Sequence, residues 1–154
     1  LLANHCCFNL YGPDRFGWGD EIRKMMSENG VDILVQLHSE ISGVEKEDIL
    51  LNTDVFIQTS RFEGMPMGIL EALSYGLPVL VTEGTTLGSY VREYNAGWAA
   101  ETSEKSIANL FEKVIEDKAY FKGKSQQAIK LIEENFEWKK IAFQATQKYS
   151  EDVC

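Results

Sequence analysis

Residues 60–78 read SRFEGMPMGILEALSYGLP, and the rest of the chain is arranged around this stretch. We expect one buried strand just before it, at 54–58 (DVFIQ), and another just after it. Between the two strands, a short loop with glycine and proline carries Glu63, and a helix starting near Met67 carries Glu71. The stretch therefore predicts a strand-to-helix junction, which is where open α/β sheets bind ligands.

The backbone at this junction is suited to an anion. Gly64, Pro66 and Gly68 leave it free of bulky side chains, so the N–H groups of Met65, Met67 and Gly68 can face a ligand. The N-terminus of the helix adds a field that stabilises an anionic group by roughly 0.3–1 kcal/mol. A phosphate or diphosphate fits these properties.

The two carboxylates fit hydroxyl groups on either side of such a diphosphate. Glu71 lies about one turn into the helix, and a carboxylate that accepts two hydroxyls is a good ligand for the diol of a ribose. Glu63, on the preceding loop, could hold the hydroxyls of a second group. The order of diol, phosphates and hydroxylated group describes a nucleotide sugar. From the residues alone, both glutamates could also be ordinary surface charges.

The elements around the stretch alternate between strand and helix. We expect further strands at 5–11, 31–37, 79–82 and 97–100, with helices at 20–29, 44–52 and up to Tyr94. Continuous apolar runs in the strands predict a parallel sheet with right-handed crossovers and helices on both faces, a Rossmann-like α/β fold. Three C-terminal helices follow, and we expect the apolar stripe of each to face the core and the lysines between them to be solvated.

Length, charge and cysteine content limit the partners and the compartment that we expect for this chain. The chain has 154 residues, one domain by length, and a net charge of −9, which argues against nucleic acid as a partner. No apolar run is long enough to span a membrane. Three cysteines, two of them adjacent, form no disulfide framework, so we infer a reducing, cytoplasmic compartment, with a peripheral place at the inner membrane face left open. The chain begins with Leu1, and we expect it to be a piece of a longer protein.

Other candidate sites are weak. Gly12 and Gly17 have the spacing of a P-loop, but the lysine that would bind phosphate is missing. His5, Cys6 and Cys7 lack a second cluster of metal ligands, so no metal site is expected.

The motif residues resemble the nucleotide-sugar signature of retaining glycosyltransferases with the GT-B fold, glycosyltransferase family 4 in particular. The pattern E-G-x-P-x-G-x-x-E-A-x-x-x-G-x-P-V follows D-V-F-I-x-x-S. The matching residues are Ser60, Glu63, Gly64, Pro66, Gly68, Glu71, Ala72, Gly76, Pro78 and Val79. The resemblance implies that residues 1–154 form the C-terminal, donor-binding domain of an enzyme whose N-terminal domain binds the acceptor.

The resemblance also implies roles. Glu71 would bind the donor ribose, and Glu63 would be catalytic, contacting the donor sugar and stabilising positive charge near its anomeric carbon. The backbone from Gly64 to Gly68 would meet the sugar and diphosphate. Leu37 and His38 lie where family members often bind the base.

The chain departs from the family pattern in two places. The Arg and Lys that bind the diphosphate in family members lie upstream of the position where this chain starts. The usual G-G-x-x-E after the next strand is replaced by residues 84–88 (GTTLG), to which we assign no catalytic role. We therefore expect the fragment to bind a nucleotide weakly, if at all, and to transfer nothing alone.

The full-length enzyme implied by the resemblance is a metal-independent hexosyltransferase of glycan or polysaccharide synthesis, with no cofactor beyond its nucleotide diphosphate sugar substrate. A GT-B epimerase or phosphorylase would share the fold, although no cofactor lysine for a phosphorylase is evident. A non-catalytic α/β binding module is the third hypothesis.

Overall fold

A computed structural model describes residues 6–151. The chain divides into two compact units, an N-terminal unit, Leu1–Ile49, and a C-terminal unit, Leu50–Cys154. All of the described strands pair in parallel, as predicted, but they form one two-stranded and one three-stranded sheet rather than a single sheet.

The N-terminal unit contains β1 (Phe8–Tyr11), α1 (Trp18–Glu28) and β2 (Val35–His38), followed by α2 (Gly43–Leu51), which crosses into the next unit. Phe8 pairs with Val35, and Tyr11 pairs with His38. The second strand starts later than predicted, because the Leu34 N–H donates to the Val31 carbonyl and the chain turns there before it extends. The predicted start of the first strand, at His5, lies outside the described residues.

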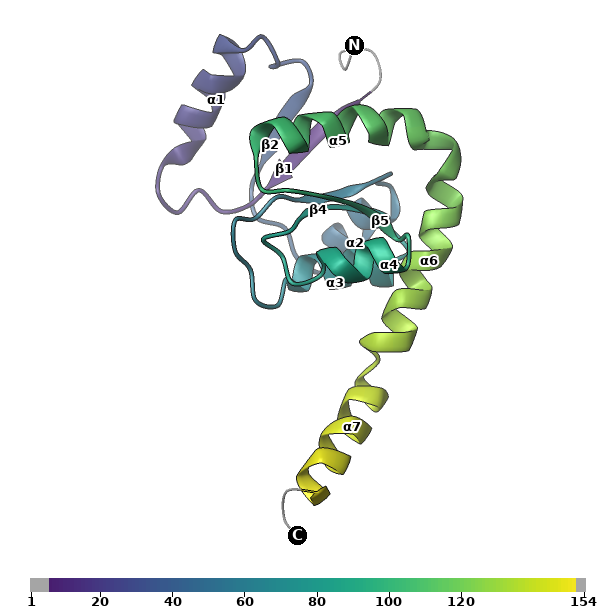
Figure 1. Cartoon of the computed structure of the whole chain (residues 1–154). Coiled ribbons are helices and arrows are strands. Elements are labelled where there is room, and N and C mark those ends of the chain that lie inside the picture. The colour runs from purple at the N-terminus through teal and green to yellow at the C-terminus, as the bar shows by residue number, and fades with distance from the viewer. Residues whose placement is uncertain (1–5, 152–154) are drawn as a thin grey trace. The chain divides into compact units, whose positions relative to one another are not determined.

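The C-terminal unit holds the junction that the sequence predicts. Its elements are β3 (Phe56–Gln58), α3 (Met67–Ser74), β4 (Val79–Thr82), α4 (Gly88–Glu93) and β5 (Gly97–Ala100). They are followed by α5 (Glu104–Glu116), the 3₁₀ turn η2 (Asp117–Tyr120), α6 (Phe121–Asn135) and α7 (Trp138–Glu151) (Figure 1). The strands lie in the order β3-β4-β5, so β4 is central and is buried along its whole length.

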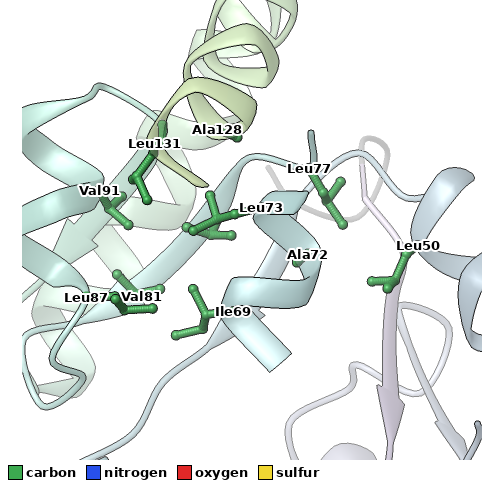
Figure 2. Packing of buried hydrophobic residues seen from close by; sticks show 12 residues of the cluster. Leu50, Ile69, Ala72, Leu73, Leu77, Val81, Leu87, Val91, Ala128 and Leu131 are labelled. Carbon is green, nitrogen blue, oxygen red and sulfur yellow. The ribbon is translucent and has the colours of Figure 1, made fainter. Parts of the chain in front are cut away.

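Helices cover both faces of the three-stranded sheet, as predicted. Val79 and Val81 of β4 belong to the larger apolar cluster, which α3, α4 and α6 complete. Figure 2 shows Leu73 of α3, Val91 of α4 and Leu131 of α6 among the residues of this cluster. Leu80 points the other way and packs with Trp98 and with residues of α5, because successive side chains of a strand alternate between faces. Each fully buried side chain of this size stabilises the fold by about 1.5–3 kcal/mol.

Helix α3 ends where Gly76 adopts a left-handed conformation, with φ of 72°. The Gly76 N–H donates to the Leu73 carbonyl, and the Leu77 N–H donates to the Ala72 carbonyl. These are the two bonds of a Schellman motif, which closes the helix and turns the chain towards β4. The G-x-P sequence at 76–78 thus explains how the helix returns to the sheet.

One of the three predicted C-terminal core stripes, that of α7, is not buried. In α6, Ala128 and Leu131 are inaccessible to solvent, as expected. In α7, Trp138 is 79% exposed and Tyr149 is 73% exposed, and α1 has no buried residue, with Met25 56% exposed. The periodicity identified these helices correctly, but it does not tell which helix has a partner to pack against.

Lys124 corrects a further expectation, because it is buried rather than solvated. Its Nζ donates to Asn95 Oδ1 at 2.6 Å and to the Gly97 carbonyl at 3.3 Å, and it lies 4.7 Å from the centre of the Trp98 ring. Asn95 itself has a positive φ of 55°. The lysine therefore joins α6 to the start of β5.

Candidate functional site

The predicted site lies beyond the carboxyl ends of β3 and β4 in the C-terminal unit. The chain leaves β3 at Gln58, passes through the loop 59–66, here called the motif loop, and enters α3 at Met67. A second loop, 83–87, follows β4. The two loops start from neighbouring parallel strands, so they meet at the edge of the sheet where α/β folds bind ligands.

The second loop holds the motif loop through backbone atoms. The Glu63 N–H donates to the Gly84 carbonyl at 2.8 Å, and Glu63 pairs with Thr85 in an isolated parallel bridge. The Thr86 hydroxyl donates to the Gly64 carbonyl at 2.6 Å. At the base of the loop, the Thr82 hydroxyl donates to the Ser60 carbonyl at 2.6 Å. Residues 84–88 were assigned no catalytic role, and Gly84 and Thr86 among them position the loop that carries Glu63.

Close contact between the loops requires glycine at position 84. A Cβ on Gly84 would lie 2.2 Å from the Ser60 carbonyl oxygen and 2.4 Å from that of Arg61. Both atoms belong to the backbone, so neither can move aside as the end of a side chain can. In contrast, a Cβ on Gly64 would meet no atom within 4 Å.

The carboxylate of Glu63 is partly buried and is bound on one oxygen. Gln58 Nε2 donates to Glu63 Oε2 at 2.8 Å, and the Ser60 hydroxyl donates to the same oxygen at 3.0 Å. Gln58 was not among the predicted site residues, although a polar residue at the end of an otherwise apolar strand is a signal that could have identified it.

Helix α3 presents the backbone that was predicted to face an anion. Pro66 is the buried N-cap residue, and no side chain caps the helix. The N–H groups of Ile69 and Leu70 bond to the Pro66 carbonyl, whereas the N–H groups of the preceding positions in a first turn have no partner within a helix. Gly68 lies close to the sheet, since a Cβ there would be 3.3 Å from both Gln58 Oε1 and Phe56 Cζ.

The remaining predicted residues of this unit lie around the start of α3. Met65 and Met67 are exposed, at 60% and 61%. Gly64, which follows Glu63 in the sequence, is exposed as well. Glu71 lies on α3 itself and is partly buried. The structure thus brings Glu63, the backbone of 64–68 and Glu71 into one strand-loop-helix segment.

Leu37 and His38 belong to the N-terminal unit, at the end of β2. His38 Nε2 lies 2.8 Å from Asn9 Oδ1, and the imidazole stacks on Tyr11 with ring centres 4.5 Å apart. Both residues line a hollow of about 430 Å³. Its wall also carries Trp18 and charged residues of both signs, Asp14, Arg15 and Arg23, the last of which pairs with Asp20.

Neither a cluster of metal ligands nor a helix suited to a membrane occurs in the described part of the chain. Within residues 6–151, no three His, Cys, Asp or Glu side chains are grouped to hold a metal ion. No helix among those residues is long and apolar enough to cross a membrane.

The amino-acid sequence is similar to one known protein family and to a few curated proteins. The sequence model of the family described as glycosyl transferases group 1 matches residues 16–135. UDP-Gal:alpha-D-GlcNAc-diphosphoundecaprenol alpha-1,3-galactosyltransferase of Escherichia coli is 38% identical over 72 residues, which are 46% of this chain and 19% of that protein. Sucrose synthase of Melioribacter roseus is 31% identical over 112 residues, 67% of this chain and 14% of that protein. The chain therefore spans less than a fifth of the curated relatives that it matches.

Solved structures share the fold. Anabaena Alr3699/HepE, solved in complex with UDP and with UDP-glucose, superposes on 97% of this chain with a TM-score of 0.83 and 21% identity in the UDP complex. The match covers 43% of that chain. Sucrose-phosphate synthase from Thermosynechococcus elongatus matches 94% of this chain and 38% of its own, with a TM-score of 0.79 and 19% identity.

Proposed function

Because the chain belongs to the glycosyl transferases group 1 family, with the GT-B fold of its neighbours, we propose that it is the donor-binding half of a retaining glycosyltransferase. The full enzyme would transfer a hexose from a nucleotide diphosphate sugar to an acceptor hydroxyl in glycan or polysaccharide synthesis. One observation carries this proposal: Glu63 lies on the loop that leads into the uncapped N-terminus of α3, and Glu71 lies about one turn into that helix.

The start of α3 is the proposed binding site of the diphosphate. Its first-turn N–H groups and the helix field favour negative charge, and no acidic residue occupies the first turn to compete. When the bond from the sugar to the diphosphate breaks, negative charge develops on the diphosphate, and fixed N–H groups stabilise that charge without reorganising. Basic side chains from outside residues 1–154 would complete the site, without a metal or other cofactor.

Glu71 is the proposed ligand of the ribose hydroxyls, since a carboxylate on the flank of a bound diphosphate can accept two hydrogen bonds. Glu63 is the proposed catalytic residue on the sugar side. Its negative charge would stabilise the positive charge that develops at the anomeric carbon of the sugar. Its position is fixed by the second loop and by Gln58.

Leu37 and His38 are the proposed contacts of the base. The hollow that they line has aromatic faces on which a base can stack. The identity of the base does not follow from these features.

We also propose that an N-terminal acceptor domain outside residues 1–154 completes the enzyme and that these residues alone do not catalyse transfer. The chain matches only 38–43% of two larger solved structures, so the proposal leaves room for such a domain. The acceptor would enter from that domain.

Titration of the isotopically labelled chain with UDP, GDP and ADP by NMR tests donor binding. We expect shifts of the backbone amides from Gly64 to Glu71 at millimolar nucleotide. If no amide moves at such concentrations, a binding module without nucleotide specificity is the better reading.

Two substitutions in the complete enzyme then separate the roles of the carboxylates. Glu71→Ala should mainly raise the Kd for the donor, by about tenfold or more for the loss of hydrogen bonds to a charged group. Glu63→Ala should mainly lower kcat, because it removes charge that acts at the reacting carbon. If both variants behave as wild type, the assignment of roles to Glu63 and Glu71 is wrong. An epimerase or a phosphorylase, which would share the fold, would be recognised by the product that it forms.

A further inference from the structure

Gln58 connects the last residue of β3 to the proposed catalytic carboxylate. Its Nε2 donates to Glu63 Oε2 at 2.8 Å, and the hydroxyl of Ser60 donates to the same oxygen at 3.0 Å. Hydrogen bonds to an ionised carboxylate are shorter and stronger than neutral ones. One oxygen of Glu63 is therefore occupied by two donors from the protein itself.

The oxygen of the same Gln58 amide group lies at the start of α3. This Oε1 would be 3.3 Å from a Cβ placed on Gly68. The side chain of Gln58 is partly buried, and its backbone pairs with Val81 in the sheet, so the side chain has little freedom to move. The amide group of Gln58 thus lies beside both the start of α3, the proposed diphosphate site, and the proposed sugar-side carboxylate.

The backbone of the motif loop does not depend on this contact. The bonds from Glu63 to Gly84, from Thr86 to Gly64 and from Thr82 to Ser60 already hold it. What Gln58 adds is the orientation of the carboxylate. Within the described residues no group donates to Glu63 Oε1, so that oxygen is the one available to a ligand.

We propose that Gln58 is a positioning residue, which with Ser60 binds Glu63 Oε2 and so presents Oε1 to the donor sugar. The inference rests on the proposed function and adds a residue that acts through Glu63 rather than on the substrate. It predicts that loss of the Gln58 amide affects recognition of the sugar and leaves recognition of the nucleotide unchanged.

The test compares Gln58→Met, which removes the donor at similar length, with Thr59→Ala, a matched change at the exposed neighbouring position. The affinities of each chain for UDP-glucose and for UDP are measured by NMR titration, with the GDP and ADP counterparts used in parallel. The same pairs are measured in a Glu63→Ala background. The Gln58 side-chain amide signals of the ligand-free chain report whether they respond to Glu63→Ala.

We expect Gln58→Met to weaken binding of the sugar nucleotide by about three- to tenfold, while binding of the free nucleotide changes less than about twofold. Thr59→Ala should change neither affinity. In the Glu63→Ala background, Gln58→Met should have no further effect, since its partner is gone. The Gln58 amide signals should shift when Glu63 is replaced.

Three results would overturn the proposal. Equal losses for sugar nucleotide and free nucleotide, or a further loss in the Glu63→Ala background, would make Gln58 a structural residue only. An amide signal that ignores Glu63→Ala would refute the contact. Two other results would refute the proposed function itself. Either no nucleotide binds to the wild-type chain at millimolar concentration, or Glu63→Ala leaves the affinity for the sugar nucleotide unchanged. In both cases the positioning role of Gln58 is refuted as well.

Discussion

Gly84→Ala should damage both the stability of the C-terminal unit and the geometry of the candidate site. The new Cβ would lie 2.2 Å from the Ser60 carbonyl oxygen, which is about 1 Å inside an ordinary contact. The clash is with backbone that two threonine hydroxyls and the Glu63 N–H hold in place. The two loops must therefore separate.

The size of the effect follows from two contributions. Overpacking of a well-packed site costs about 1–3 kcal/mol. Weakening of the hydrogen bond from Glu63 to Gly84 adds about 0.5–1.5 kcal/mol. We expect the free energy of unfolding to fall by roughly 2–4 kcal/mol, a large share of the ~5–15 kcal/mol typical of a domain.

The assay is urea unfolding followed by circular dichroism, with wild type and variant compared at the same pH and salt. Gly123→Ala is the matched control, because a Cβ on Gly123 would meet no atom within 4 Å and the residue lies inside α6. Replacing a helical glycine by alanine at an open position stabilises by roughly 0.5–1 kcal/mol, so the two variants should shift in opposite directions.

A second readout locates the damage. Amide spectra of Gly84→Ala should change at residues 60–65 and 83–87 and stay constant in α5 and α6. If Gly84→Ala unfolds within about 0.5 kcal/mol of wild type, or if its spectral changes avoid the motif loop, the contact between the loops is not what the structure indicates.

Further predictions concern the frame around the site. Ser103→Ala should lower the free energy of unfolding by about 0.5–2 kcal/mol, because the Ser103 hydroxyl accepts a hydrogen bond from the Ser106 N–H at the start of α5. Ser103→Thr keeps a hydroxyl and should retain most of the wild-type stability. Equal losses of stability for the two variants in chemical denaturation would contradict the cap. Burial lowers the pKa of Lys124 below its ordinary 10.5. Between the lowered pKa of the folded state and 10.5, the unfolded chain binds more protons than the folded chain, so the free energy of unfolding should rise with pH. Lys124→Met should lack that rise in denaturation curves taken across the alkaline range, and an unchanged pH profile would speak against a buried lysine. Leu73→Ala should cost about 2–5 kcal/mol, since Leu73 is inaccessible in the larger cluster, and a loss below about 1 kcal/mol would show that the site is not packed as described.

The strand-loop-helix segment from β3 to β4 was predictable from sequence because its signals are local. A buried run, a loop with glycine and proline, an apolar helix and the ending at Gly76 each depend on residues a few positions apart. The spacing of Glu63 and Glu71 belongs to the same local pattern.

Other parts depended on neighbours far along the chain. The stripe of α6 is buried and that of α7 is exposed, although both have helical periodicity. Lys124, expected in solvent with the other lysines, is buried because Asn95 and the carbonyl of Gly97 supply its hydrogen bonds. Periodicity describes the faces of a helix, but burial depends on what packs against each face.

By itself, the sequence determined that this chain is an α/β protein with parallel strands and that Glu63, the glycines and Glu71 share one junction. Only the tertiary structure decided what holds that junction in place. Gly84 and Thr86 meet the motif loop from the end of the neighbouring strand, and Gln58 reaches Glu63 across it. Gly84 and Thr86 reach the motif loop because parallel strands bring their carboxyl ends to one edge of the sheet, an adjacency that exists only once the strands have paired.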